Sequence, residues 1–406
     1  MYSKPTRILQ MMAGVAMATA LMAGAQTPDS SSAPAAPAAA PAAAQAPATP
    51  APATPPPAPT WSVGPMDVSG FIDGYYSYNF NTPTAAANGQ ANDLYNFNDK
   101  TDQFNLSAAK LTLNHDPDPV GAHVDFIYGR TNNFINASAS NTTSADQLNY
   151  IEQAFLSVKP AKAKGFELDF GKFVTSAGAE VIEAKDDWNY SRSLLFAWAI
   201  PYWHFGARTS MPVSKTETIG LQVVNGWNNI SKTNGGVTIG ATSALVKPKA
   251  SWFLNYYVGP ENATTTTGYR NLIDSTLLLT PSGKFNAYIN YDYGQNRDAI
   301  VAQGDKKLNH WQGIAAAAKG QVSGTQALVG RFEYFTDPNG FETGTAQHLY
   351  EFTATYEYKA APGILTRFEY RRDWSNVAFF HKNDTQMVDA QSTVTAGLIA
   401  FFGPKR

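Results

Sequence analysis

The stretch Val68-Ser-Gly-Phe-Ile-Asp-Gly-Tyr-Tyr-Ser-Tyr-Asn79 decides the fold class, because its side chains alternate between two kinds. One face of an extended chain here would carry Asp73, Tyr75, Ser77 and Asn79, and the other would carry Ile72, Tyr76 and Tyr78. Successive side chains of a β-strand point to opposite faces, so a period of two predicts a strand with one polar and one apolar face.

The same alternation recurs to the C-terminus in strand-sized pieces, for example at 166–170, 285–292, 328–334, 350–358 and 367–373. The pieces are joined alternately by short and long connections. The short ones, rich in the Pro, Gly and Asp of turns, are 116–121, 159–164, 212–216, 246–249, 281–284, 321–325 and 359–363. The long ones are 82–101, 131–147, 175–201, 228–237, 260–268, 296–307, 337–347 and 375–389.

An even strand number with short turns at one end and long loops at the other is typical of an outer-membrane barrel. We therefore predict an all-β fold, a transmembrane antiparallel up-and-down β-barrel of about sixteen strands, with long extracellular loops and short periplasmic turns. Strands at 238–247 and 308–320 alternate poorly, which leaves fourteen or eighteen strands open. Aromatic residues near strand ends, such as Tyr76, Trp252 and Tyr356, would form the interfacial girdles.

Composition excludes several other classes. The 406 residues include only 15% charged residues, no cysteine and a formal net charge of −2. A soluble chain averages about 25% charged residues, and no apolar run of roughly 20 residues follows residue 25, so a helical membrane protein is excluded. The lack of a basic block argues against nucleic-acid binding, and the lack of cysteine excludes disulfide scaffolds and thiolate metal sites. A secreted β-sandwich or β-helix is the competing fold, but a sandwich has no long and short loop alternation and no β-helix repeat is present.

The N-terminal part predicts export. Lys4 and Arg7, an apolar stretch from Ile8 to Met22, and the small residues Ala23-Gly24-Ala25 have the order of a signal peptide. The predicted domains are a signal peptide at 1–25, a disordered Ala/Pro-rich periplasmic spacer at 26–65 and the barrel at 66–406. The predicted location is the outer membrane of a Gram-negative bacterium.

The inner face of such a barrel is its functional surface. The predicted pore-lining residues are Asp73, Lys110, Asp125, Asp169, Arg208, Asp292, Arg331, Glu333, Glu351, Arg367, Glu369 and Arg371. With further acids at 167, 274, 357 and 373, acidic residues outnumber basic ones, which predicts a weak preference for cations. The alternative is that neighbouring charges pair, Arg331 with Glu333 or Arg367 with Glu369, and leave little net field.

The connection 175–201 is unusually apolar for a loop in water and also carries Glu180, Glu183, Lys185, Asp186, Asp187 and Arg192. We expect this third long loop to fold into the barrel as a constriction. A loop that packs over the rim or against a neighbouring subunit is the alternative.

No catalytic or metal site is expected. The sequence contains no G-x-S-x-G, H-E-x-x-H or G-x-x-x-x-G-K-[ST] motif. The six histidines are scattered, and the Asp- and Asn-containing loops lack the spacing of a calcium loop. We therefore predict no enzyme activity, no cofactor and no metal.

Several segments resemble the OmpL-like β-barrel porin family: GFIDGYYSYNFN (70–81), DPDPVGAHVDFIYG (116–129), YIEQAFLSVKP (150–160), LNYYVGPE (254–261) and, above all, 166–208. The resemblance implies an outer-membrane diffusion channel for small hydrophilic solutes and ions. Its expected partners are outer-membrane lipid and such solutes, with a homotrimer as an assembly to test and no nucleic acid. The alternative function is a non-conducting structural or adhesive barrel whose Pro-rich segment contacts periplasmic or cell-wall partners.

Overall fold

The chain is described here by a computed structural model that covers residues 62–137, 148–300 and 306–404. The predicted signal peptide and nearly all of the predicted spacer lie outside the described residues. Residues 62–65 form a two-residue strand, β1 (Ser62–Val63), and a turn that leads into β2. Within the described part of the chain, no helix is both long enough and apolar enough to cross a membrane.

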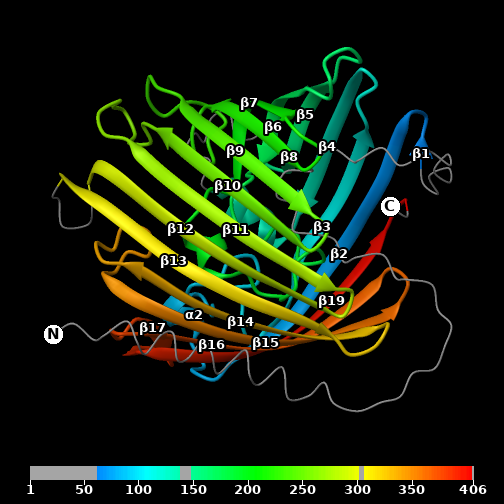
Figure 1. Ribbon diagram of the computed structural model, residues 1–406. Coiled ribbons are helices and arrows are strands. Elements are labelled where there is room, and N and C mark those ends of the chain that lie inside the picture. The colour runs from blue at the N-terminus through cyan, green and yellow to red at the C-terminus, as the bar shows by residue number, and fades with distance from the viewer. Residues whose placement is uncertain (1–61, 138–147, 301–305, 405–406) are drawn as a thin grey trace. The chain divides into compact units, whose positions relative to one another are not determined.

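The fold is an antiparallel β-barrel of sixteen strands, as predicted. In chain order the strands are β2 (Met66–Asn79), β3 (Gln103–His115), β4 (Val120–Tyr128), β5 (Ile151–Val158), β6 (Glu167–Val174), β7 (Trp203–Pro212), β8 (Glu217–Val224), β9 (Thr238–Lys247), β10 (Ala250–Gly259), β11 (Arg270–Ser282), β12 (Phe285–Ile300), β13 (Lys306–Gln321), β14 (Gln326–Asp337), β15 (Gln347–Ala361), β16 (Ile364–Ser375) and β19 (Ala390–Phe402). Each strand pairs with the next along the chain, and β19 pairs with β2 to close the ring (Figure 1, red beside blue). Closure leaves no open edge.

The alternation in β2 has the predicted consequence. Asp73, Tyr75, Ser77 and Asn79 are buried, whereas Ile72 on the opposite face is 58% exposed. The predicted girdle residues face outward: Trp252, Tyr256, Tyr291, Tyr356, Tyr358 and Tyr370 are exposed, and Tyr76, Tyr78, Tyr293 and Tyr334 are half-buried. The polar face therefore lines the interior and the apolar face is outside.

All seven predicted turns separate consecutive strands. The weakly alternating stretches at 238–247 and 308–320 are β9 and part of β13, so the strand number is sixteen. The predicted loop at 296–307 is too long, because β12 and β13 continue into it and pair as far as Ile300 with Lys306. The loop at 375–389 contains a small hairpin, β17 (Phe380–Lys382) with β18 (Gln386–Val388).

The wall is uneven in height. Strands β5, β6 and β8 have 8 residues each, whereas β12 and β13 have 16 residues each. The helices in the described residues are short: α2 (Ala85–Asn88) in the first long loop, α3 (Arg130–Ala137) in the second and α4 (Leu194–Trp198) in the third.

Residues on the outer face allow a test of how deep each lies in the bilayer. Ala396 lies mid-strand in β19 and Ala400 lies two residues from its periplasmic end, and both are exposed on the outer face. Ala396→Arg should lower the free energy of unfolding in lipid vesicles by about 2–4 kcal/mol, because arginine is costly at the midplane of the bilayer. Ala400→Arg should cost about 0–1 kcal/mol. Equal costs, measured by urea titration of the folded barrel, would contradict this membrane placement.

Candidate functional site: the third loop inside the barrel

The third long connection, residues 175–202, which we call loop 3, lies against the inner wall. Its short helix α4 begins after Ser193, whose side chain accepts a hydrogen bond from the Phe196 N–H at 3.0 Å. The apolar residues of α4, Leu194, Leu195 and Phe196, are buried. A loop with this apolar content is stable only when it is covered, and the barrel interior covers it.

Three wall arginines bind loop 3 through its backbone carbonyl groups. Arg331 donates to the Ser191 carbonyl at 2.8 Å, and Arg371 donates to the Arg192 carbonyl at 2.7 Å. Arg367 donates to the carbonyls of residues 184, 187 and 189. The guanidinium group suits this role, because it presents five N–H donors in a fixed plane.

Wall acids bind the N–H groups of the same loop. The Glu369 carboxylate accepts from the N–H groups of Tyr190 at 2.6 Å and Ser191 at 2.9 Å. Glu333 accepts from the Leu195 N–H at 3.2 Å, and the Tyr190 hydroxyl donates to Asp73 at 2.7 Å. Irregular backbone that is buried needs such partners, so wall charges of both signs fix the loop.

A second anchor holds the loop further round the wall, at β3–β5. Lys110 on β3 contacts Glu183 of loop 3, and its Nζ lies 2.9 Å from Asp125 on β4 and 2.6 Å from Glu152 on β5. Burial alone would raise the pKa of Glu183, but Lys110 and Lys185 together hold it below its ordinary value. Glu183 is therefore ionised at neutral pH, and the anchor is an ion pair.

The wall charges also pair with one another. Arg331 lies 2.6 Å from Glu180, 3.1 Å from Glu333 and 2.8 Å from Glu351. Further pairs are Arg371 with Asp373 at 2.7 Å, Arg208 with Asp169 at 2.7 Å, Lys319 with Glu357 at 2.8 Å and Arg367 with Glu357 at 2.8 Å. The expected pair of Arg331 with Glu333 is present, whereas Arg367 pairs with Glu357 on the adjacent strand and not with Glu369.

All twelve residues predicted to line the pore lie on the inner face, but most do not border open space. All except Arg208 are buried, and the Arg208 side chain is 26% exposed. Of the six loop residues, Glu180, Asp187 and Arg192 are buried, whereas the side chains of Glu183, Lys185 and Asp186 are 15%, 30% and 34% exposed. The exposed charges of this region are thus concentrated on the segment 183–186.

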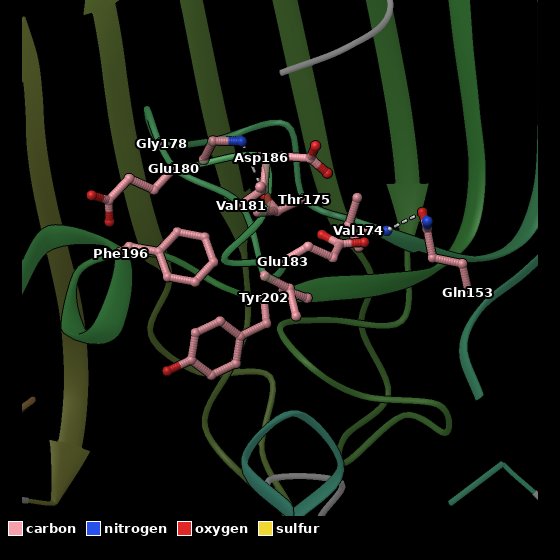
Figure 2. Close-up of a pocket in the computed structure, with 12 residues that line it drawn as sticks. Gln153, Val174, Thr175, Gly178, Glu180, Val181, Glu183, Asp186, Phe196 and Tyr202 are labelled. Atoms are coloured by element: carbon pink, nitrogen blue, oxygen red, sulfur yellow. Dashed lines mark hydrogen bonds between the residues drawn. The ribbon is translucent and has the colours of Figure 1, made fainter. Parts of the chain in front are cut away.

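A cavity of about 90 Å³ remains between loop 3 and the ends of β5 and β6. Its lining includes Gln153, Thr175, Glu180, Glu183 and Asp186, with the rings of Phe196 and Tyr202 on one side (Figure 2). In Figure 2 the Gln153 side chain accepts a hydrogen bond from the Val174 N–H, at 3.1 Å.

Sequence reasoning missed two contributors. The first long loop also packs against loop 3: Asn96 donates to the Ala197 carbonyl at 3.2 Å, Trp198 donates to the Leu94 carbonyl at 3.2 Å, and Phe97 is fully buried. The sequence feature that could have indicated this packing is Leu94-Tyr-Asn-Phe97, which places two aromatic residues and a leucine in a loop. Glu152 was missed because it is the extra residue of a β-bulge on β5, between Ile151 and Gln153, and bulges re-aim side chains.

The family model described as "Putative beta-barrel porin-2, OmpL-like" matches residues 65–402. The chain belongs to this porin family. It is therefore an outer-membrane barrel of a porin family, not an enzyme, and the resemblance of the sequence segments is confirmed. No curated protein sequence is significantly similar to it.

Solved structures share the barrel at low sequence identity. The outer membrane channel DcaP of Acinetobacter baumannii is 12% identical, with a TM-score of 0.55, over 84% of this chain and 99% of that one. An anion-selective porin from Comamonas acidovorans is 11% identical, with a TM-score of 0.56, over 83% and 99%. OmpT of Vibrio cholerae is 12% identical, with a TM-score of 0.53, over 83% and 97%. At these identities the likeness shows the fold of the porin and nothing about its solute.

The arginine contacts make a prediction about the mobility of loop 3. Arg367→Met removes three hydrogen bonds to loop carbonyls and should lower the local opening free energy of residues 184–189 by about 2 kcal/mol. Hydrogen exchange of those amides should then be roughly thirtyfold faster. The matched control is Arg372→Met on the same strand, because Arg372 is exposed and donates to Ser392 instead. Equal exchange in both variants would show that Arg367 does not hold the loop.

Proposed function

We propose that this porin is a passive diffusion channel for small hydrophilic solutes and ions, and that loop 3 narrows it. The observation that supports the proposal is the position of loop 3, which is bound to β14–β16 and, further round the wall, to Lys110 of β3. A chain segment fixed inside the barrel at two places narrows any passage beside it. One space beside the loop is the cavity next to β5 and β6.

The proposed selectivity is a weak preference for cations. The wall bases Arg331, Arg367 and Arg371 are buried and donate to loop carbonyls and acids, so their charge is already compensated. Three carboxylates, those of Glu180, Glu183 and Asp186, belong to the cavity lining, whereas the bases paired with them, Arg331, Lys110 and Lys185, do not. An acid-lined constriction favours cations.

Planar-bilayer recording of the refolded protein tests the channel. Stepwise insertion of conducting units is expected, and deletion of 180–195 should at least roughly double the unit conductance, because it removes the segment that fills the interior. In a KCl gradient the reversal potential should have the sign of K⁺ preference. Silence over many insertions would exclude the channel, and unchanged conductance after the deletion would exclude loop 3 from the passage.

One observation favours the alternative of a non-conducting barrel: nearly all the charged wall residues are covered. In that case the structural role would depend on the Pro-rich segment. A silent barrel that co-sediments with cell wall, and loses this on deletion of 27–60, would support the alternative. A conducting barrel that does not co-sediment would exclude it.

We further propose a homotrimer in which the low wall contacts the next copy. A strand of 8 residues, such as β5, β6 or β8, rises about 27 Å and spans roughly 19 Å when tilted by about 45°. The apolar band of such barrels is about 25 Å tall, so lipid would meet uncovered polar groups along this wall. Light scattering of the detergent complex should give three protomers, and a monomer at micromolar concentration would exclude the assembly.

A further inference from the structure

Three carboxylates converge where loop 3 meets the wall: Asp125 of β4, Glu152 of β5 and Glu183 of loop 3. One oxygen from each lies within 4.8 Å of the other two. All three share one ammonium group, that of Lys110. The cluster therefore brings three carboxyl groups to a single ammonium group, and uncompensated charge in a buried site costs several kcal/mol.

Each nearby base also contacts a group outside the cluster. His123 Nε2 lies 3.0 Å from Asp125 Oδ2, and its Nδ1 lies 2.9 Å from Asn114 Oδ1. Lys172 donates to Asn136 and to the Ile151 carbonyl and lies over the Trp203 ring, at 4.1 Å from its centre. Lys185 is 2.5 Å from Asp186, a fourth carboxylate beside the cluster.

An unpartnered atom in the cluster is a second, independent observation. Glu152 is fully buried, and although its Oε2 meets Lys110, its Oε1 has no hydrogen-bond partner among the described residues. Buried carboxylate oxygens are almost always satisfied, so such an atom indicates a bound ion or water.

The space and the spacing fit a hard divalent cation. The cavity of about 90 Å³ borders Glu183, Gln153 and Asp186 (Figure 2), and a single water needs only roughly 10–15 Å³, so a partly hydrated ion has room. Calcium binds oxygen at about 2.3–2.6 Å, so two ligands of one ion lie up to about 5 Å apart. The separation of at most 4.8 Å among the three carboxylates meets that limit.

We propose that a divalent cation, Ca²⁺ by ligand type, binds between this carboxylate cluster and the cavity, with Glu152 and Glu183 as protein ligands and water completing its shell. The ion links loop 3 to β5 beside Lys110 and lowers the negative charge of the constriction. Binding itself does not require conduction, whereas the effect on ion current rests on the proposed channel function.

Calorimetric titration of the refolded, chelator-treated protein with CaCl₂ tests the site. One ion per chain is expected, with a dissociation constant on the order of 0.1–1 mM. Glu152→Gln and Glu183→Gln should each weaken binding at least about tenfold. Glu167→Gln is the matched control, because Glu167 on β6 pairs with Lys159 at 3.1 Å and is not part of the cluster. Absence of saturable binding, or equal binding by both site variants and the control, would overturn the proposal.

A variant that should gain affinity for calcium distinguishes loss of the site from misfolding, because a misfolded protein would not bind more tightly. Lys110→Met removes the competing ammonium group, so it should bind CaCl₂ at least about tenfold more tightly, and its melting temperature should rise with CaCl₂. Unchanged affinity would place the ion elsewhere and overturn the site.

The current supplies a separate readout. In bilayers, millimolar CaCl₂ should reduce the K⁺ current of the native protein more than that of Glu152→Gln. Calcium binding without this difference in current would overturn the role of the ion in conduction. A barrel that never conducts would refute the proposed channel, and the calorimetric result alone would then decide whether the site exists.

Discussion

Hydrocarbon offers no hydrogen-bond partner, and the rest of the structure depends on that constraint. Every backbone N–H and C=O in the wall must pair within the sheet, so the sheet must close, and β19 pairs with β2 over ten residue positions from Thr393 with Asn79 to Phe402 with Gly70. The outer side chains must be apolar because they face lipid. The polar half of the alternating pattern is thereby directed inward, which explains why a chain with 15% charged residues has so many buried charges.

Those inward charges need partners of their own, and loop 3 supplies many of them. Arg367 and Glu369, two residues apart on β16, bind carbonyl and N–H groups of the same loop segment. A wall with only one sign of charge could satisfy only half of the loop backbone. The mixed charge of β14–β16 is thus explained by loop 3, which these strands hold. A solute would interact only with the wall charges that the loop leaves uncovered.

The sequence predicts the architecture well because the strand pattern is local. The seven turns, the sixteen strands and the inward direction of Asp73 or Arg331 follow from a period of two and from turn residues. What could not be predicted depends on how neighbouring segments meet. Arg367 pairs with Glu357 on the adjacent strand, the bulge on β5 re-aims Glu152, and residues of the first long loop pack on α4. The side chains assigned to the inner face point inward. Their exposure to solvent could not be inferred, because it depends on where a loop of 28 residues lies.

The central claim is that loop 3 is bound to the β14–β16 wall in the folded barrel. The chain has no cysteine, so a double variant supplies the only thiols. Asn189 of loop 3 donates to Thr355 of β15 at 2.7 Å. In Asn189→Cys/Thr355→Cys, a bifunctional thiosulfonate with a two-carbon spacer should join the two positions almost completely. In the control Asn189→Cys/Gln222→Cys the second thiol lies on β8, where Gln222 contacts Ser176 at the start of the loop, and the pair should remain unlinked. Free thiols in the first variant, both labelled rapidly by a maleimide, would show that the loop does not lie on this wall.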